Sequence, residues 1–327
     1  MRRFLISGGV NKKTSSDKGA WAFYLGGKVL DVNINGKGSV LIEDLSVPGY
    51  IEAGKKIGTV FKAGSKSGGE YVLCTTTEVS KYDPCSGEKI KTVSHPKFND
   101  VHHAVELKDE SLLVVSTGLD CLINIDWSGF VIRYWALDPS REYMFNDSID
   151  YRSIESTKPH SHHPNFVFLI DDDIYVTRFK DKDAVCLTSP QKKSFNIPYG
   201  NVHDGIVSGE NVWFTTTNGW ICAFDRKSKE EVYSLDLNTI YPGETPLGWC
   251  RGLSLLGDGK VFVGFSRLRK TKLTENIQWA AGKVMKSKRR PYPTRLALID
   301  LNNRRLISEI DLEAGFSMNA IFSIVEI

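Results

Sequence analysis

The chain has 327 residues, of which 41% are hydrophobic and 25% are charged, a composition typical of a globular protein with a sizeable core. Its formal net charge of +3 is well below that of a strongly basic nucleic-acid-binding domain, so we expect no nucleic-acid partner. No stretch approaches the run of about 20 apolar residues that crosses a bilayer, so we expect no membrane partner.

The N-terminus and the cysteines predict a cytoplasmic protein. Residues 1–9 contain only a short apolar run, which is too short for the core of a secretory signal. The six cysteines are spread along the chain without a CxxC pair, so we expect buried thiols rather than a disulfide framework.

The first strands predicted along the chain form an incomplete four-stranded unit. Residues 2–9, 20–25 and 28–34 resemble the second, third and fourth strands of a four-stranded unit that lacks its first strand. A weak copy of the whole unit lies at 70–93, and its first strand is expected at 57–64.

Four clearer copies follow. Each has a short polar lead, an apolar strand, a tight turn, a strand ending in Ser, Thr or Gly, a strand ending in Asp, and a last strand. The copies lie at 101–135, from 162 to 198, at 202–237 and at 250–312. Four short antiparallel strands that recur about every 40 residues are typical of a β-propeller blade.

The C-terminus supplies the first strand that the N-terminal unit lacks. Residues 317–327 resemble a first strand with nothing after it, so the two chain ends together make one blade and close the ring. We predict an all-β, six-bladed β-propeller that forms a single domain over residues 1–327. The weak copy at 70–93 leaves room for a seventh blade.

Alignment of the blade leads explains why the histidines cluster. The leads HHAV, HPNF, HDGI, CRGL and MNAI place three histidines in the first column and a mixed polar set in the second and third. The first column holds His102, His163 and His203; the second holds His103, Asp204, Arg251 and Asn319; the third holds Asn165. First strands line the channel of a propeller, so these side chains are expected to ring one mouth, with either His102 or His103 pointing inward.

Three imidazoles from three blades can hold a divalent transition metal such as Zn, Fe or Mn, and we predict His102, His163 and His203 as its ligands. His103, Asp204 and Arg251 are predicted to act in catalysis, with His103 or Asp204 as proton shuttle. Without a metal, the imidazoles can serve as general acid or base. His160 and His162 are expected to be loop residues, and His95 a turn residue.

Two long segments are expected at the same mouth. They are the connection at 136–161 and a basic insertion at 267–294, which we interpret as a lid. Arg178 and Arg267 are predicted to bind an anionic substrate, together with Asn165 and Asn319. The chain has no GxGxxG, P-loop, GxSxG or HExxH motif, so we expect no nucleotide cofactor.

The segments HPNFVF, NVHDGI and WCRGLSLLGDGKVFVGFSRLR resemble those of a family of uncharacterised bacterial β-propellers. More distantly the chain is similar to propeller lyases (virginiamycin B lyase, oligogalacturonate lyase) and to arylsulfotransferases, which place histidines at the channel mouth. The resemblance implies the fold and, by analogy, a histidine-lined site.

These observations favour a metal-dependent propeller enzyme, of lyase or hydrolase type, acting on a small anionic metabolite. Two alternatives stay open: a non-catalytic binding platform for a protein or peptide, and an oxygenase with histidine-bound iron. The sequence gives no prediction of the oligomeric state.

Overall fold

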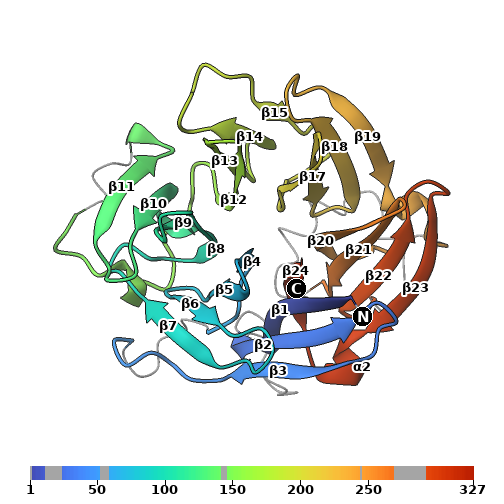
Figure 1. The fold of residues 1–327 in the computed structure, drawn as a ribbon, viewed down its shortest axis with the longest axis horizontal. Coiled ribbons are helices and arrows are strands. Elements are labelled where there is room, and N and C mark those ends of the chain that lie inside the picture. Colours follow the sequence, from blue (N-terminus) through green and yellow to red (C-terminus); the bar gives the residue numbers. More distant parts are fainter. Residues whose placement is uncertain (1, 12–23, 52–58, 141–145, 244, 269–291) are drawn as a thin grey trace.

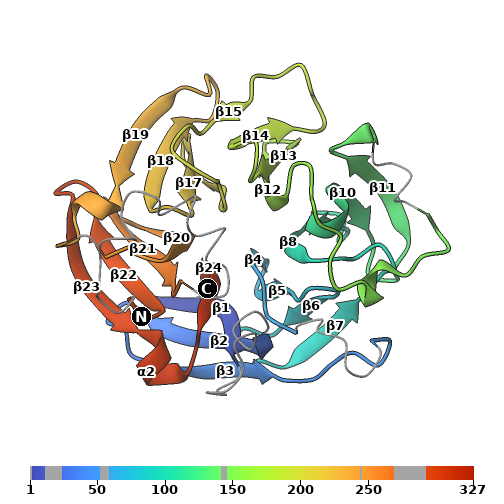
Figure 2. The same ribbon diagram turned by 180° about the vertical axis from the view of Figure 1, so that it is seen from behind.

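The computed structural model describes residues 2–11, 24–51, 59–140, 146–243, 245–268 and 292–327. Six four-stranded antiparallel sheets stand around a common axis (Figures 1 and 2). This is the predicted six-bladed β-propeller, and the described residues contain no seventh sheet.

We number the blades I to VI and give their strands from the axis outward. Blade I contains β24 (Ala320–Glu326), β1 (Arg3–Asn11), β2 (Tyr24–Asn33) and β3 (Gly38–Asp44). Blade II contains β4 (Gly64–Ser67), β5 (Glu70–Cys74), β6 (Val79–Tyr82) and β7 (Lys89–Val93). Blade III contains β8 (Val101–Glu106), β9 (Leu112–Ser116), β10 (Cys121–Ile125) and β11 (Val131–Ala136).

The remaining blades follow the same plan. Blade IV contains β12 (Pro164–Ile170), β13 (Asp173–Arg178), β14 (Asp183–Cys186) and β15 (Phe195–Asn196). Blade V contains β16 (Ile206–Ser208), β17 (Asn211–Thr216), β18 (Trp220–Asp225) and β19 (Glu231–Asp236). Blade VI contains β20 (Trp249–Gly257), β21 (Lys260–Ser266), β22 (Arg295–Asp300) and β23 (Arg305–Asp311). Short helices are η2 (Thr117–Leu119), η4 (Tyr151–Ser153), η5 (Leu237–Thr239) and α2 (Leu312–Phe316).

Blade I closes the ring by pairing β24 with β1, as predicted. Two strand assignments were wrong. The segments expected as separate strands at 20–25 and 28–34 belong, where described, to the single strand β2, and the fourth strand is β3. Gly26 and Gly27 suggest a turn between strands, yet they lie within β2, where a Cβ on Gly27 would come 2.5 Å from the Phe61 ring.

The first strand of blade II begins later than expected, at Gly64 rather than at 57. The preceding residues bond to neighbours instead of extending the strand. Lys62 N–H donates to the Cys74 carbonyl at 2.8 Å, and Ala63 N–H donates to the His102 carbonyl of blade III at 3.0 Å. The segment is therefore a lead, like those of the other blades.

The recurring Asp of the sequence repeat closes the turn between the third and fourth strands. Its side-chain oxygen accepts a backbone N–H two to four residues later, which satisfies a turn donor that no ladder reaches. The four examples are Asp83 with Ser86 at 2.7 Å, Asp126 with Ser128 at 2.8 Å, Asp225 with Ser228 at 2.7 Å and Asp300 with Asn303 at 3.0 Å.

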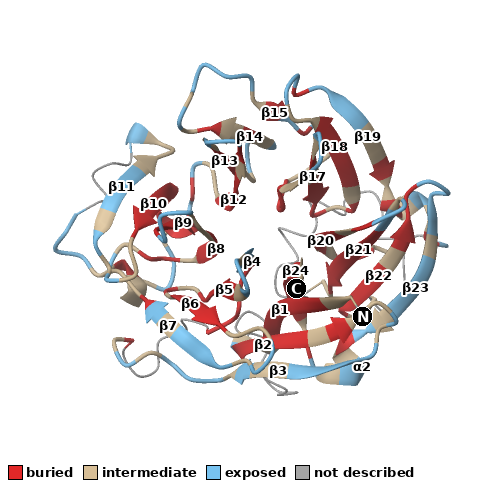
Figure 3. Ribbon diagram, viewed as in Figure 1, coloured by how far each residue is buried: buried red, intermediate tan, exposed pale blue. Residues whose placement is uncertain are grey.

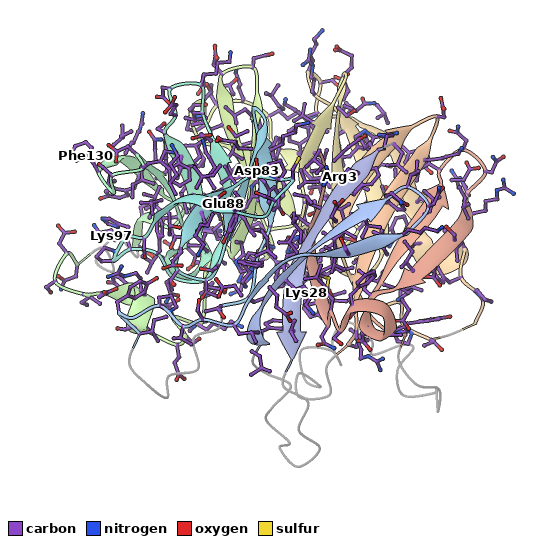
Figure 4. All side chains as sticks on the ribbon, turned by 60° about the horizontal axis from the view of Figure 1, so that its bottom comes forward. Arg3, Lys28, Asp83, Glu88, Lys97 and Phe130 are labelled. Carbon is purple, nitrogen blue, oxygen red and sulfur yellow. The ribbon has the colours of Figure 1, made fainter. Side chains whose placement is uncertain are left out.

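Residues of the middle strands are mostly buried, and those of the outermost strands are more exposed (Figure 3). In blade III every residue of β10 is buried, whereas β11 is largely exposed. Phe130, which is 68% exposed, projects at the outer edge (Figure 4). The core lies between neighbouring blades, for example where Phe168 of blade IV meets Phe214 of blade V at a ring-centroid distance of 5.9 Å. All six cysteines are free thiols and five are buried, so the prediction of unpaired thiols is confirmed.

Four of the six innermost strands are irregular near their first residues. Register shifts lie between Val101 and His103 in β8, between Pro164 and Val167 in β12, between Cys250 and Leu253 in β20, and at Phe322 in β24. A bulge adds an unpaired residue and re-aims its side chain. The propeller thus turns side chains toward the axis where its inner strands begin. Among the described residues, no helix has the length and apolarity that a membrane crossing requires.

Candidate functional site

A cavity of about 1110 Å³ lies at the end of the axis where the inner strands begin. Each of the six blades contributes at least one side chain to its wall. In blade order these are Phe322, Lys62, His102, His163, His203 and Arg251. The loops that follow the second strands of blades II, IV, V and VI complete the wall.

The three histidines of the first column meet in this cavity. The ring centroid of His102 lies 5.4 Å from that of His163 and 6.4 Å from that of His203. His160 lies beside them. Its Nδ1 is 2.7 Å from the Nδ1 of His163, so one ring donates a hydrogen bond to the other. His160 was expected to be an ordinary loop residue, but it is buried and lines the cavity.

The lead of blade IV is held by a carboxylate from blade III. Asp120 accepts hydrogen bonds from the backbone N–H groups of Ser161, His162 and His163, at 2.6, 3.1 and 2.6 Å. His163 is thereby kept at φ 56°, a left-handed conformation that few non-glycine residues adopt. His162 points away from the cavity wall and bonds Asp181 at 2.9 Å, as expected of a loop residue.

Hydrogen bonds set the tautomers of two of the imidazoles. His102 Nδ1 donates to the backbone carbonyl of Asp100 at 2.8 Å, and His203 Nδ1 faces the carboxylate of Asp204 at 3.4 Å. Both partners only accept, so the neutral rings carry their proton on Nδ1 and a lone pair on Nε2. The Nε2 of His203 is buried and has no hydrogen-bond partner.

The environment keeps these rings uncharged. Burial lowers the pKa of His163 to about 3, and it lowers the pKa of His203. Burial, and then the charge of Lys62, lower the pKa of His102 well below its ordinary value. At neutral pH all three imidazoles are therefore neutral.

Two cations share one face of the mouth. Lys62 Nζ lies 4.8 Å and Arg251 Cζ 3.9 Å from the centroid of the Phe322 ring, so one ligand can reach both. Lys62 pairs with Asp100 at 2.9 Å, and this charge helps to hold the pKa of Asp100 well below its usual range. Arg251 has no such contact at its Nε, which is buried without a hydrogen-bond partner. Burial lowers the pKa of Arg251 to about 10.

Lys62 was missed by the sequence analysis because the lead of blade II carries no histidine. The signal that points to it is positional: Val-Phe-Lys-Ala leads directly into the first strand of blade II, and His-His-Ala-Val lies at the start of the first strand of the next blade. The N–H···O bond from Ala63 to His102 then brings the two leads together.

The other predicted site residues are divided between the cavity and its surroundings. Asn165 and Arg267 line the cavity, although Arg267 also forms an ion pair with Glu313. Arg178 does not line it, because its guanidinium is paired with Asp183. Asn319 does not line it either, and its backbone N–H donates to the Gly9 carbonyl at 2.8 Å.

His103 and Asp204 also lie outside this mouth. The open choice between His102 and His103 resolves in favour of His102, because His103 faces a second cavity of about 610 Å³ formed by the later residues of the inner strands. There the His103 ring stacks on Phe166 at 3.6 Å. Asp204 is buried behind the wall, where Thr215 Oγ1 and Gly252 N–H donate to its carboxylate.

The described side chains do not form a metal site. No group of three or more His, Cys, Asp or Glu among them is arranged to hold a metal ion. The cations Lys62 and Arg251 also line the same cavity and repel a divalent cation. Most of the predicted basic lid, residues 269–291, lies outside the described residues, so the lid interpretation stays a prediction.

Comparison with known proteins adds the fold alone. No protein-family model and no curated protein matches the chain. Among solved structures, a protein of unknown function from Bacteroides caccae is similar with a TM-score of 0.62 and 15% sequence identity. The similarity covers 100% of this chain and 99% of the other. At this identity the likeness shows the fold alone, and it supports no specific family, neither the lyases nor the arylsulfotransferases.

Proposed function

We propose that the cavity lined by all six blades, at the mouth of the channel, is an active site where a small anionic metabolite binds and a neutral imidazole transfers a proton. The observation that carries the proposal is Arg251, a cation whose buried Nε has no hydrogen-bond partner in the wall of a histidine-lined cavity. A buried donor without a partner is costly, and a bound carboxylate, sulfate or phosphate supplies the partner.

The charge of the cavity favours an anion. Its described wall carries six cationic side chains and a single carboxylate, that of Asp100. The cations are Lys62, Lys158, Lys180, Lys182, Arg251 and Arg267. A concave site lined by one sign of charge concentrates ligands of the opposite sign.

His102 is the residue to which we assign proton transfer. Its Nε2 holds a lone pair because Nδ1 donates to Asp100, and the lowered pKa keeps that lone pair free of a proton at neutral pH. In a lyase-type step, Nε2 takes a proton from the carbon beside the ligand's anionic group. The electron pair of that C–H bond forms a C=C bond, and a leaving group departs with its own electron pair. In a hydrolase-type step, Nε2 instead takes a proton from water as the water oxygen bonds to an electrophilic atom of the ligand, and the leaving group departs with the electron pair of its broken bond.

The proposal needs no metal. The predicted set of His102, His163 and His203, bound to Zn, Fe or Mn, has no support among the described residues, and the iron-oxygenase alternative depends on the same set. Metal analysis of protein purified without a histidine tag tests this directly. The metal hypothesis requires at least about one equivalent of bound transition metal after reconstitution.

The binding-platform alternative predicts a channel plugged by apolar side chains. A cavity of about 1110 Å³ lined by cations and imidazoles favours the enzyme instead. The six free thiols support the proposed cytoplasmic location, since cytosolic thiols stay reduced.

Titration of the whole chain with carboxylates, sulfate and phosphate tests the proposal. We expect Arg251→Gln and Lys62→Met each to weaken anion binding at least tenfold. Lys66→Met is the matched control, because Lys66 lines the second cavity and should leave binding unchanged. If none of these anions binds the unaltered protein, or if the Lys66 variant loses as much affinity as the other two, the site is not at this mouth.

Turnover provides the second test. His102→Asn keeps a side-chain donor for the Asp100 carbonyl and removes the Nε2 lone pair. For a substrate found among bound anions, kcat should fall by 10²–10⁴-fold with little change in affinity.

A further inference from the structure

The wall of the cavity contains two aromatic rings that the proposed proton transfer does not use. Phe179, which follows β13, and Trp249, the first residue of β20, both line the cavity and are only half-buried. Their planes are 11° from parallel and their centroids lie 6.5 Å apart. Centroids about 4.5–7 Å apart are usual for offset-stacked aromatic pairs, so the two rings stack with an offset, and because both are only half-buried each leaves ring surface exposed.

Phe179 is held in place by polar contacts of its backbone. Its N–H donates to the His163 carbonyl at 3.1 Å, and its carbonyl accepts from the Asn201 amide at 2.8 Å. Its ring also lies 5.1 Å from the His163 ring. Aromatic rings therefore continue from His163 through Phe179 to Trp249, with the Phe179 ring tilted by 56° from His163 and nearly parallel to Trp249.

The Phe179 ring lies across the mouth from Lys62 and Arg251, whereas Trp249 lies on the same strand as Arg251, two residues before it. Phe179 belongs to blade IV, which stands across the ring from blade I, where Phe322 carries Lys62 and Arg251 over its ring (Figure 1). A ligand that spans the mouth can place an anionic group on the cations and a flat apolar group on Phe179 and Trp249. The volume of about 1110 Å³ is also far more than a bare inorganic anion fills.

Two buried acceptors face the same space. Asn165 donates through its amide nitrogen to the Val202 carbonyl at 3.2 Å, and its Oδ1 is buried with no partner. The Nε2 of His203 is the second buried acceptor without a partner. Both residues are more than nine-tenths buried and both line the cavity, so they call for a donor supplied by the ligand.

We infer that the ligand is an aromatic anion: a planar ring with a hydroxyl or amino donor, joined through a CH-bearing carbon to a carboxylate or similar group. This rests on the proposed function and adds its substrate class. The anion binds Lys62 and Arg251, the ring packs on Phe179 and Trp249, and the donor reaches Asn165 or His203. Planar groups stack on aromatic faces, which saturated rings of the same size match poorly.

A matched series of monocarboxylates tests the ring. We expect benzoate to bind at least tenfold more tightly than acetate and about 2- to 10-fold more tightly than cyclohexanecarboxylate, which has similar bulk but is not flat. Phe179→Leu and Trp249→Leu should abolish the preference for benzoate over cyclohexanecarboxylate and leave acetate binding unchanged. Arg251→Gln should weaken all three.

The outcomes separate the two proposals. If all three acids bind with equal affinity, the ring inference is overturned while the anion site stands. A preference for benzoate that persists in both leucine variants also overturns it, because the ring then lies elsewhere. If none binds, both proposals fail. At least one of the three hydroxybenzoate isomers should bind more tightly than benzoate. If all three bind equally or more weakly, the inference that the ligand carries a hydrogen-bond donor is overturned.

Discussion

The Asp204 carboxylate accepts a hydrogen bond from the backbone N–H of Gly252 at 2.8 Å and so ties the lead of blade V to the innermost strand of blade VI. Thr215 Oγ1 donates to the same oxygen. Gly252 has a φ of 83°, where a side chain would be strained, so the strand bends here to present its N–H. The group proposed from sequence as a proton shuttle thus holds two blades together beside the site.

Replacing Asp204 with Ala should destabilise the protein. The change leaves the buried Gly252 N–H without its acceptor, which costs about 1–3 kcal/mol. Asp204→Asn keeps one oxygen for that N–H, so its loss should be smaller. Denaturant unfolding of the two variants measures the difference. An Ala variant as stable as the unaltered protein would show that water replaces the carboxylate.

The seam between the chain ends should tolerate no side chain at Gly8. A Cβ there would lie 1.8 Å from the Ala320 carbonyl oxygen, which belongs to the backbone and cannot move aside cheaply. Gly8→Ala should therefore lower the free energy of unfolding by about 3 kcal/mol. Gly69→Ala is the control, because a Cβ on Gly69 meets nothing within 4 Å. Equal stability of the two variants would contradict the close approach of Gly8 in β1 to the Ala320 backbone in β24.

Thiol labelling should count one reactive cysteine in the native protein and six after denaturation. Cys85 is exposed, whereas burial raises the pKa of Cys74, Cys121 and Cys222 and so suppresses the reactive thiolate. Cys85→Ser should remove the fast phase of reaction with a disulfide reagent. A second fast thiol would show that a buried cysteine becomes exposed by local opening.

The repeat predicted the blades because β-propeller blades share a polarity pattern and turn residues, and four of the six also share the closing Asp. It also predicted that His102, His163 and His203 converge, because equivalent positions of equivalent strands face one axis. That inference required no knowledge of any contact between distant residues.

The rest of the site depends on contacts that the repeat does not encode. His160 enters the cavity because Asp120, some 40 residues earlier, fixes the backbone that follows it. Arg251 faces the mouth although the histidines come from the column before it, because the bulge between Cys250 and Leu253 shifts the register of β20. Such shifts follow from packing around the axis, so no alignment of leads reveals them.

Acid should destabilise the propeller through its neutral buried histidines. Burial lowers the pKa of His103 to about 3, whereas its unfolded value is near 6.5. Asp204 and His203 are the titratable groups that act on it most strongly. Between these two pKa values the unfolded chain binds a proton that the folded protein does not, so stability is present above pH 6.5 and is lost as pH falls toward 3. From pH 6.5 to 4.5, His103 alone should contribute a loss of about 2–3 kcal/mol.

His103→Asn isolates this contribution. The Asn oxygen can accept the Val167 N–H that His103 Nδ1 accepts at 3.3 Å, and the side chain does not titrate. The variant should lose stability at neutral pH, because the stack on Phe166 is gone. Its further loss between pH 6.5 and 4.5 should be smaller than that of the unaltered protein by about 2–3 kcal/mol. Denaturant unfolding at both pH values supplies the comparison. Parallel losses in the two proteins would mean that His103 becomes protonated in the folded state near its ordinary pKa, and hence that the second cavity admits water to the ring.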